Sequence, residues 1–186
     1  MRISRILPWL LSTCLVACSS IGTNSIDSRQ NVGPCPTVGA LYEAGRIVAF
    51  EGDTEFFDDI TYTGEIIGVR LFCRYVDDEP LLAEVEVGFA FGKGEKATES
   101  KHTYDYFVAV TRRDRTVLAR ETFSIEANFG GNSVVAASDL IGNIVIPRVD
   151  PGISGGNFEV LVGFDLTEKQ LKFNREGKRF RLDAGR

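Results

Sequence analysis

The sequence has very little of the residue types from which metal sites and nucleophilic active sites are built. Its 186 residues include a single histidine, His102, and four cysteines. A zinc site needs several His or Cys ligands, and a Ser/His or Cys/His mechanism needs a base beside a nucleophile. We therefore predict that His102 lies in a solvent-exposed loop, and that the protein is not an enzyme and has no metal or cofactor. Chemistry that uses carboxylates alone stays open as an alternative, because 26 Asp and Glu residues are present.

The sequence also lacks a second long apolar run and an excess of positive charge. After the N-terminal residues no apolar run reaches the length of a membrane-spanning helix. The 21 Lys and Arg residues are outnumbered by the 26 Asp and Glu residues, which gives a net charge of −5. Nucleic-acid binding and electrostatic docking on anionic lipid both need a basic face, so we expect neither.

The first 18 residues have the layout of a bacterial export signal. Arg2 and Arg5 precede an apolar run that is too short to span a bilayer, and the small residue Ala17 precedes Cys18. The stretch Leu-Val-Ala-Cys at 15–18 resembles the lipobox of bacterial lipoproteins. The resemblance implies that residues 1–17 are removed and that Cys18 carries a diacylglycerol and an acylated amino end. The alternative is a plain signal peptide with an incidental cysteine.

Several acyl chains would hold the protein on a membrane, whereas one chain gives only marginal binding. Cys18 is followed by Ser19 and not by the Asp that retains enterobacterial lipoproteins in the inner membrane. The resemblance therefore implies the outer membrane, facing the periplasm. Residues 18–34 are rich in Ser, Asn and Gly without periodicity, which predicts a flexible tether. We expect one folded domain over 35–186.

If Cys14 leaves with the signal and Cys18 is lipidated, as the resemblance implies, Cys35 and Cys73 are the two cysteines left in an oxidising compartment. Such a pair most simply forms a disulfide. It would close a loop of about 38 residues, which the chain-entropy model values at roughly 4 kcal/mol. Two buried free thiols are the alternative.

Apolar and polar residues alternate with a period of two along most of the domain. This pattern is typical of half-buried antiparallel strands. The predicted core-facing sets begin with Ile67, Val69, Leu71, Cys73 and Tyr75, and continue with Leu81, Ala83, Val85, Val87, Phe89 and Phe91. Two further sets are Val117, Ala119, Phe123, Ile125, Ala127 and Phe129, and then Phe158, Val160, Val162 and Phe164.

With further strands near 38–50, 104–111 and 141–149, the pattern predicts about seven strands. The predicted fold is therefore all-β, an antiparallel two-sheet β-sandwich of immunoglobulin-like proportions. One short C-terminal helix is predicted, because Thr167 and Gln170 form a capping box and Gly177 supplies the helix end.

Three groups of residues are candidate sites. The acidic residues Glu51, Asp53, Glu55, Asp58 and Asp59 could bind calcium, although a solvated loop is the simpler interpretation. Tyr104 and Tyr106 either line a central strand that is buried on both faces, which we favour, or form an exposed pair that binds a partner. The basic residues Lys172, Arg175, Lys178, Arg179 and Arg181 could pair with the acidic segments of the domain, an acidic partner or anionic headgroups, although scattered surface charge is the simpler interpretation.

Three stretches of the domain, Cys35-Pro36 and residues 106–110 and 162–167, resemble an uncharacterised group of proteobacterial envelope lipoproteins. That resemblance implies no activity. We expect a membrane-anchored β-sandwich module that binds or scaffolds a protein or another envelope component. A carrier of a small hydrophobic ligand between the two sheets and a carboxylate-dependent enzyme are the alternatives.

Overall fold

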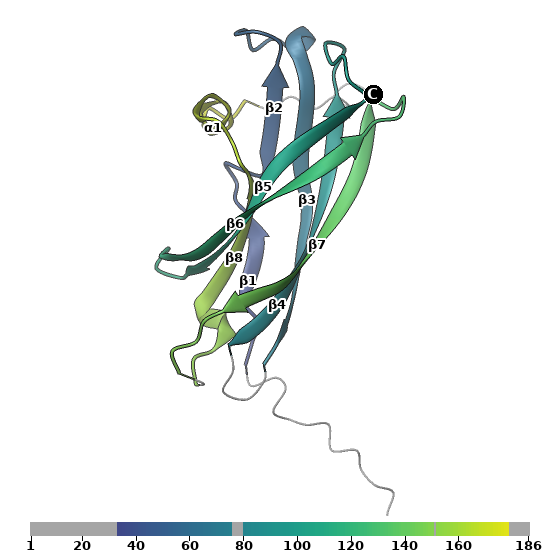
Figure 1. Ribbon diagram of the computed structural model, residues 1–186. Coiled ribbons are helices and arrows are strands. Elements are labelled where there is room, and N and C mark those ends of the chain that lie inside the picture. The colour runs from purple at the N-terminus through teal and green to yellow at the C-terminus, as the bar shows by residue number, and fades with distance from the viewer. Residues whose placement is uncertain (1–32, 76–79, 151, 179–186) are drawn as a thin grey trace, which may run out of the picture.

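The computed structural model describes residues 33–75, 80–150 and 152–178. These residues form two four-stranded sheets that pack face to face, with one short helix at their side (Figure 1). The predicted all-β two-sheet sandwich is confirmed, with eight strands in the described ranges where about seven were expected. The predicted signal peptide, Cys18 and residues 18–32 of the expected tether lie outside the described residues.

The strands divide equally between the sheets. The first sheet has the order β1 (Thr37–Ala40), β8 (Phe158–Phe164), β5 (Lys101–Arg112) and β6 (Val117–Asn128). The second has the order β2 (Arg46–Phe50), β3 (Ile60–Arg74), β4 (Leu81–Lys93) and β7 (Val134–Ile146). β1 pairs with β8 in parallel, and the other neighbours are antiparallel. Two 3-10 turns, η2 (Phe57–Asp59) and η3 (Gly155–Asn157), precede β3 and β8.

The single strand predicted near 38–50 is in fact two strands, and these belong to different sheets. The chain leaves β1 at Ala40, turns through residues 41–45 and enters β2 at Arg46. The turn is closed by a hydrogen bond from the Ala44 N–H to the Leu41 carbonyl. Residues 41–45 therefore connect the edge strand of the first sheet directly to the edge strand of the second sheet.

The core is built from aromatic rings that meet between the sheets. Phe89 and Phe91 of β4 face Tyr106 and Tyr104 of β5, with ring centroids 5.0 and 4.3 Å apart. Phe164 of β8 lies 5.8 Å from Phe89. All five rings are at most 2% exposed, so this part of the space between the sheets is filled with side chains.

The predicted core faces of β4 and β8 are confirmed, but two others need correction. Ile67 does not share the inner face of β3, because the register with β4 shifts between Ile66 and Gly68 and turns Ile67 outward, 61% exposed. A one-residue shift moves side chains to the opposite face of a strand. In β6 the last residues of the predicted set are buried, whereas Val117 is 59% exposed.

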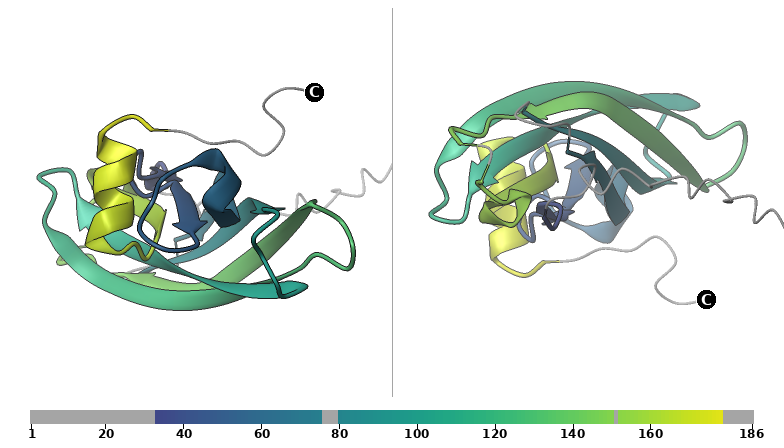
Figure 2. Two further views of the ribbon diagram at one scale, coloured as in Figure 1. Left: turned by 90° about the horizontal axis from the view of Figure 1, so that it is seen from above. Right: turned by 90° about the horizontal axis from the view of Figure 1, so that it is seen from below.

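The predicted helix is confirmed as α1 (Glu168–Arg175). The Thr167 side chain accepts a hydrogen bond from the Gln170 N–H, and the Gln170 side chain accepts one from the Thr167 N–H, which completes the capping box. Gly177 adopts a φ of +73°, the left-handed conformation that ends many helices. Buried Phe173 packs edge-on against Phe50 of β2, so α1 covers the β2 edge of the second sheet (Figure 2).

Cys35 and Cys73 form a disulfide, as the sequence predicts. The bond joins the residues just before β1 to the end of β3, and therefore links the two sheets. Beside it the Tyr75 hydroxyl donates to the Pro34 carbonyl (2.8 Å) and accepts from the Gly155 N–H (2.7 Å). The start of the described domain is thus fastened to both β3 and the β7–β8 connection.

Candidate functional site

The most apolar of the described surface clefts lies where the chain crosses from β1 to β2. Its cavity volume is about 460 Å³. Its walls come from the crossing turn, β5, β6, the end of β8 and α1. The lining residues are Leu41, Tyr42, Glu43, Ala44, Phe107, Arg120, Phe164, Asp165, Leu166, Leu171 and Arg175.

The turn at 41–45 is held by backbone hydrogen bonds to both sheets. The Leu41 N–H donates to the Val162 carbonyl, and the Ala44 carbonyl accepts from the Phe164 N–H, both at 2.8 Å. The Gly45 carbonyl accepts from the Ile66 N–H at 2.9 Å. Because the turn bonds to β8 on one side and to β3 on the other, it forms a fixed wall.

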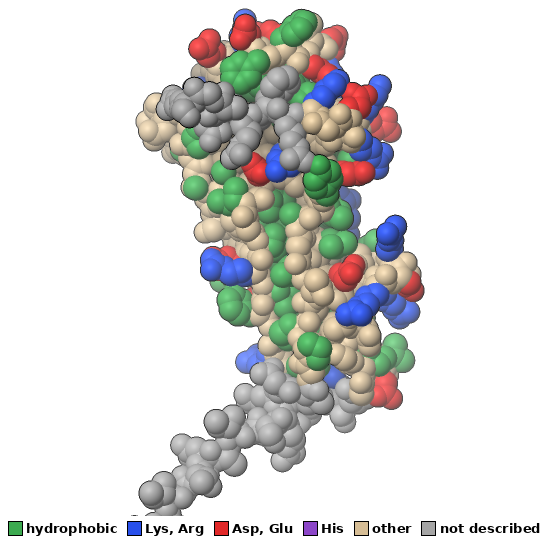
Figure 3. All heavy atoms as spheres, turned by 180° about the vertical axis from the view of Figure 1, so that it is seen from behind, with side chains coloured by type: hydrophobic (Ala, Val, Ile, Leu, Met, Phe, Trp, Pro, Cys, Tyr) green, Lys and Arg blue, Asp and Glu red, His purple; other side chains and the backbone are tan. Residues whose placement is uncertain are grey.

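Helix α1 clamps the other end of the same turn. The Asn174 side-chain amide donates to the carbonyls of Glu43 (2.7 Å) and Arg46 (2.8 Å). The Arg175 Nε donates to the Glu43 carboxylate at 2.7 Å. Charged side chains of both signs cluster on the part of the surface where α1 lies (Figure 3).

The floor of the cleft depends on a glycine. A Cβ atom at Gly163 would lie 2.7 Å from the Ala44 Cβ and 2.9 Å from the Phe107 Cζ. Only glycine therefore lets the Phe107 ring and the crossing turn approach β8 this closely. Phe107 becomes part of an apolar floor on the outer face of the first sheet.

The charges at the rim of the cleft are paired. The Arg120 Nη2 lies 3.0 Å from the Asp165 carboxylate, and its guanidinium sits over the Phe107 ring, 4.3 Å from the centroid. With Arg175–Glu43, the rim has two ion pairs whose charges cancel. Both carboxylates of the rim are thus engaged by arginine.

Two apolar side chains of the crossing turn are accessible at this rim. Tyr42 is 71% exposed and Leu41 is 37% exposed. Exposed apolar side chains that border an apolar floor are typical of binding surfaces. Since the turn that carries them is fixed on three sides, they are presented in a defined position.

The structure corrects the exposed-tyrosine interpretation of Tyr104 and Tyr106. The two side chains are 2% and 0% exposed and face the core. The Tyr104 hydroxyl donates to the Thr63 carbonyl (2.9 Å), and the Tyr106 hydroxyl donates to the Asp139 carboxylate (2.7 Å). Burial raises the pKa of both hydroxyls, and the hydrogen bond to Asp139 raises the pKa of Tyr106 further. The favoured interpretation, a central strand buried on both faces, is therefore correct for the face that carries the tyrosines and only in part for the other, where Asp105 is exposed and Phe107 is half-buried.

His102 is not the exposed loop residue that the sequence predicted. It lies in β5, half-buried, with its ring stacked on Tyr62 of β3 at a centroid distance of 4.0 Å. The Tyr104 ring meets it edge-on at 4.6 Å. Burial lowers the pKa of His102.

The acidic residues between 51 and 59 mostly pair with lysines and not with one another. Lys96, Lys169 and Lys178 contact, respectively, Glu51 (3.4 Å), Asp53 (3.5 Å) and Glu55 (2.5 Å). The Asp59 carboxylate accepts from the Thr54 hydroxyl. Within the described ranges, no three His, Cys, Asp or Glu side chains are grouped as metal ligands.

The basic C-terminal residues take part in internal ion pairs, one of the arrangements expected from the sequence. Arg175 contacts Glu43, and Lys178 contacts Glu55 and Glu176. Lys172 lies 3.9 Å from Glu176. Arg179 and Arg181 lie outside the described residues.

Sequence reasoning missed the cleft, because its residues come from five separate segments. The one local signal was Gly45, which follows the apolar pair Leu41-Tyr42 inside a stretch that we interpreted as a single strand. Comparison with known protein families, curated proteins and solved structures finds no match to this chain. None of the described helices is long and apolar enough to cross a membrane.

Proposed function

We propose that the protein is a non-catalytic binding module of the bacterial envelope, tethered to the outer membrane through lipid on Cys18. The observation that carries the binding role is the cleft beside α1. It combines an apolar floor, a neutral rim and two accessible apolar side chains on a fixed turn. A pre-formed surface of this kind binds with little loss of conformational freedom.

The position of the cleft suits a tethered domain. β1, which follows the N-terminal segment, begins in the lower half of Figure 1, whereas α1 lies in the upper half. The disulfide and the Tyr75 hydrogen bonds fasten the chain at its point of entry. A pull on the tether would therefore be taken up at the entry end, and the cleft would keep its shape.

The same cleft supports a second candidate function, the binding of a small apolar ligand. Its volume of about 460 Å³ lies in the range of small-molecule sites. The aromatic core fills the space that a ligand between the sheets would need, so the outer cleft is the better site for such a ligand. The pairing of Glu43 and Asp165 with arginines supports a binding role over carboxylate catalysis.

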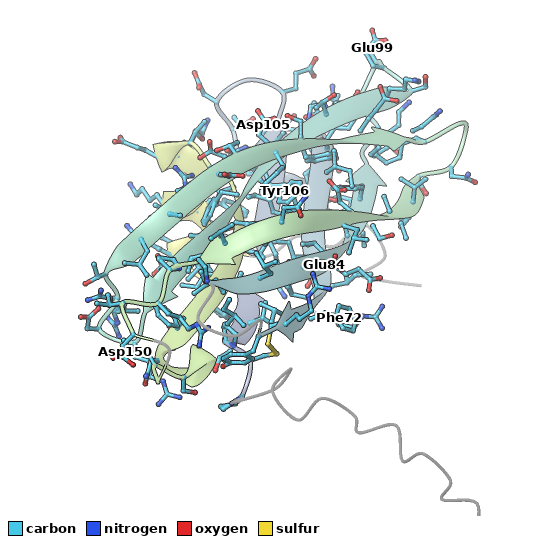
Figure 4. The ribbon with its side chains drawn as sticks, turned by 60° about the horizontal axis from the view of Figure 1, so that its bottom comes forward. Phe72, Glu84, Glu99, Asp105, Tyr106 and Asp150 are labelled. Atoms are coloured by element: carbon cyan, nitrogen blue, oxygen red, sulfur yellow. A yellow bond between two sulfur atoms is a disulfide. The ribbon has the colours of Figure 1, made fainter. Side chains whose placement is uncertain are left out.

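The test is chemical crosslinking in intact cells with the full chain, followed by affinity recovery. We compare the wild-type protein with a Tyr42→Ala variant and with a control, Phe72→Ala. Phe72 is 58% exposed and lies on β3 on the side away from α1 (Figure 4). A protein recovered with wild type and with Phe72→Ala, but lost with Tyr42→Ala, supports the proposal. Recovery that is unchanged by Tyr42→Ala contradicts it.

The small-ligand candidate predicts a different result in the same cells. Extraction of the purified protein should then release an apolar compound that is lost from Tyr42→Ala, with no protein partner recovered. The lipid anchor is tested separately by Cys18→Ser, which should release the protein from the membrane fraction. Retention of that variant in the membrane would contradict lipidation at Cys18.

A further inference from the structure

The second sheet ends in a long strand whose outer edge is open. β7 is the last strand of its sheet and pairs only with β4 among the described strands. In Figure 1 the upper part of β7 forms the margin of the molecule. An open edge presents unpaired N–H and carbonyl groups to any extended segment that can reach it.

The two long edge strands of the sandwich are protected very differently. β6 carries three charged side chains: Arg120, Glu121 and Glu126. The 13 residues of β7 carry one, Asp139. Charged side chains are a common means of preventing edge-to-edge pairing, and β7 makes little use of them.

The backbone shows which residues of β7 offer their groups to a partner. The Ser133 carbonyl accepts a hydrogen bond from the Lys93 N–H of β4. In an antiparallel pair the next residue points the other way, so the backbone N–H and carbonyl of Val134 point away from β4. The same alternation makes Ala136, Ser138 and Leu140 point outward. The Leu140 N–H donates to the Asp139 side chain at 2.9 Å, which fits an outward direction and means that this one N–H is already engaged.

The side chains along this edge suit pairing with a second copy of the same strand. In a two-fold contact, residue i of one copy meets residue j of the other copy, and residue j meets residue i, so the strand must be complementary to itself. A two-fold axis at Ala137 places Val134 of each copy opposite Leu140 of the other copy. The residues nearest the axis, 136–138, are all small. Val134 is 51% exposed and Leu140 is 62% exposed, so both are accessible.

Charge also selects this register over its neighbours. An axis at Asp139 would place two carboxylates directly opposite each other, which is unfavourable. With the axis at Ala137, Asp139 faces Val135 of the second copy. Farther along the strand Asn143 has a φ of +59° and the register with β4 shifts, so the regular edge ends before this residue.

We propose that the protein forms a two-fold dimer in which the β7 strands of two copies pair antiparallel about Ala137. The second sheets of the two copies then become one continuous sheet. The cleft beside α1 lies on the opposite side of the sandwich from β7, so the dimer would present two clefts.

The first experiment is disulfide trapping of the full chain in its membrane. Ala137→Cys places two cysteines opposite each other in a non-hydrogen-bonded pair, where Cα atoms lie about 4.5 Å apart, within reach of a disulfide. Mild oxidation should give a band at twice the mass. The control Phe72→Cys lies on β3 away from this edge and is 58% exposed, more than the half-buried Ala137, and should give none.

A charge-exchange experiment keeps the proposal testable if Ala137→Cys perturbs the fold. One version of the chain carries Val134→Lys and Leu140→Lys, and a second carries Val134→Glu and Leu140→Glu. Each version alone should associate at least about tenfold more weakly than wild type, and their mixture should recover association. Ile67→Lys with Phe72→Lys, on the same face but away from the edge, should leave association unchanged.

A wild-type chain that stays monomeric, with no trapped dimer of Ala137→Cys, overturns the proposal. So does trapping of Ala137→Cys to a different protein, which would make β7 a docking edge for that protein. Both readouts are independent of the cleft, because Tyr42→Ala should leave dimerisation intact.

Discussion

The two sides of the sandwich are closed in different ways. On the β1–β2 side the chain itself crosses between the sheets, a disulfide joins the entry segment to β3, and α1 packs over the edge of β2. On the β6–β7 side the Tyr106 hydroxyl of β5 (labelled in Figure 4) donates a hydrogen bond to the Asp139 carboxylate of β7 and so links the two sheets. The closed side carries a cleft of fixed shape, whereas the open side carries a strand edge.

Our two proposals place two kinds of recognition surface on one small fold. A cleft needs walls that do not move, and these are provided by contacts between segments far apart in the sequence. A strand edge that pairs with another strand needs only a regular strand whose outward backbone N–H and carbonyl groups are unpaired. Substitutions on the two sides should therefore have separable effects.

The largest effect is expected from loss of the covalent link on the closed side. Replacing Cys35 and Cys73 together by Ala removes the closure of a loop of 38 residues. The chain-entropy model predicts a loss of about 4 kcal/mol in the free energy of unfolding. Urea unfolding of the variant and of the oxidised wild type measures it. A loss below about 1 kcal/mol would mean that the β1–β2 side is held mainly by its other contacts.

The next effect concerns the floor of the cleft. Gly163→Ala forces the new Cβ against Ala44 and Phe107, and overpacking of this kind typically costs about 1–3 kcal/mol. The matched control is Gly39→Ala on β1, where a Cβ would meet nothing within 4 Å. Thermal unfolding of both variants measures the difference. Equal stability of the two would show that the crossing turn can shift, contrary to the fixed wall that we describe.

The fold was largely predictable from the sequence, because strand periodicity depends on local pattern. The faces of β4 and β8 and the capping box of α1 are each encoded within about a dozen residues. The errors occur where backbone geometry interrupts the pattern. The bulge of β3 at Ile67 and the crossing turn at 41–45 change the face or the sheet without a change in apolar content.

The cleft could not be predicted in the same way. In the sequence, Phe107 and Arg120 look like ordinary strand residues. They come close to Asp165 and α1 only because of the order of β5, β6 and β8 in the sheet. His102 was misplaced for a related reason. Its neighbours in sequence are polar, but its ring partner Tyr62 comes from a strand 40 residues away. Contacts between sheets have no local signal.

On the open side, Tyr106→Phe removes the hydroxyl that bonds to Asp139 across the sandwich. Loss of a hydrogen bond to a charged group should lower the free energy of unfolding by about 1.5–3 kcal/mol, nearer the lower end because Asp139 keeps its bond to the Leu140 N–H. Tyr104→Phe is the control, since its hydroxyl donates to a neutral carbonyl and should cost less. A smaller loss for Tyr106→Phe than for Tyr104→Phe would contradict this account of the open side.

The smallest effect should come from protonation of His102, whose ring stacks across the sandwich on Tyr62. Burial lowers its pKa in the folded protein below the ordinary value of 6.5, so between the two pKa values the unfolded chain binds more protons. The contribution of His102 to the free energy of unfolding is therefore complete above pH 6.5 and is lost as the pH drops from there through the folded pKa. His102→Phe keeps a ring against Tyr62 and removes the titrating group, and should lose this part of the pH dependence. Urea unfolding between pH 7.5 and about 5 separates the two proteins. The opposite result would contradict this account: if lowering the pH made the wild type more stable relative to His102→Phe, the protonated ring would have a partner for its charge.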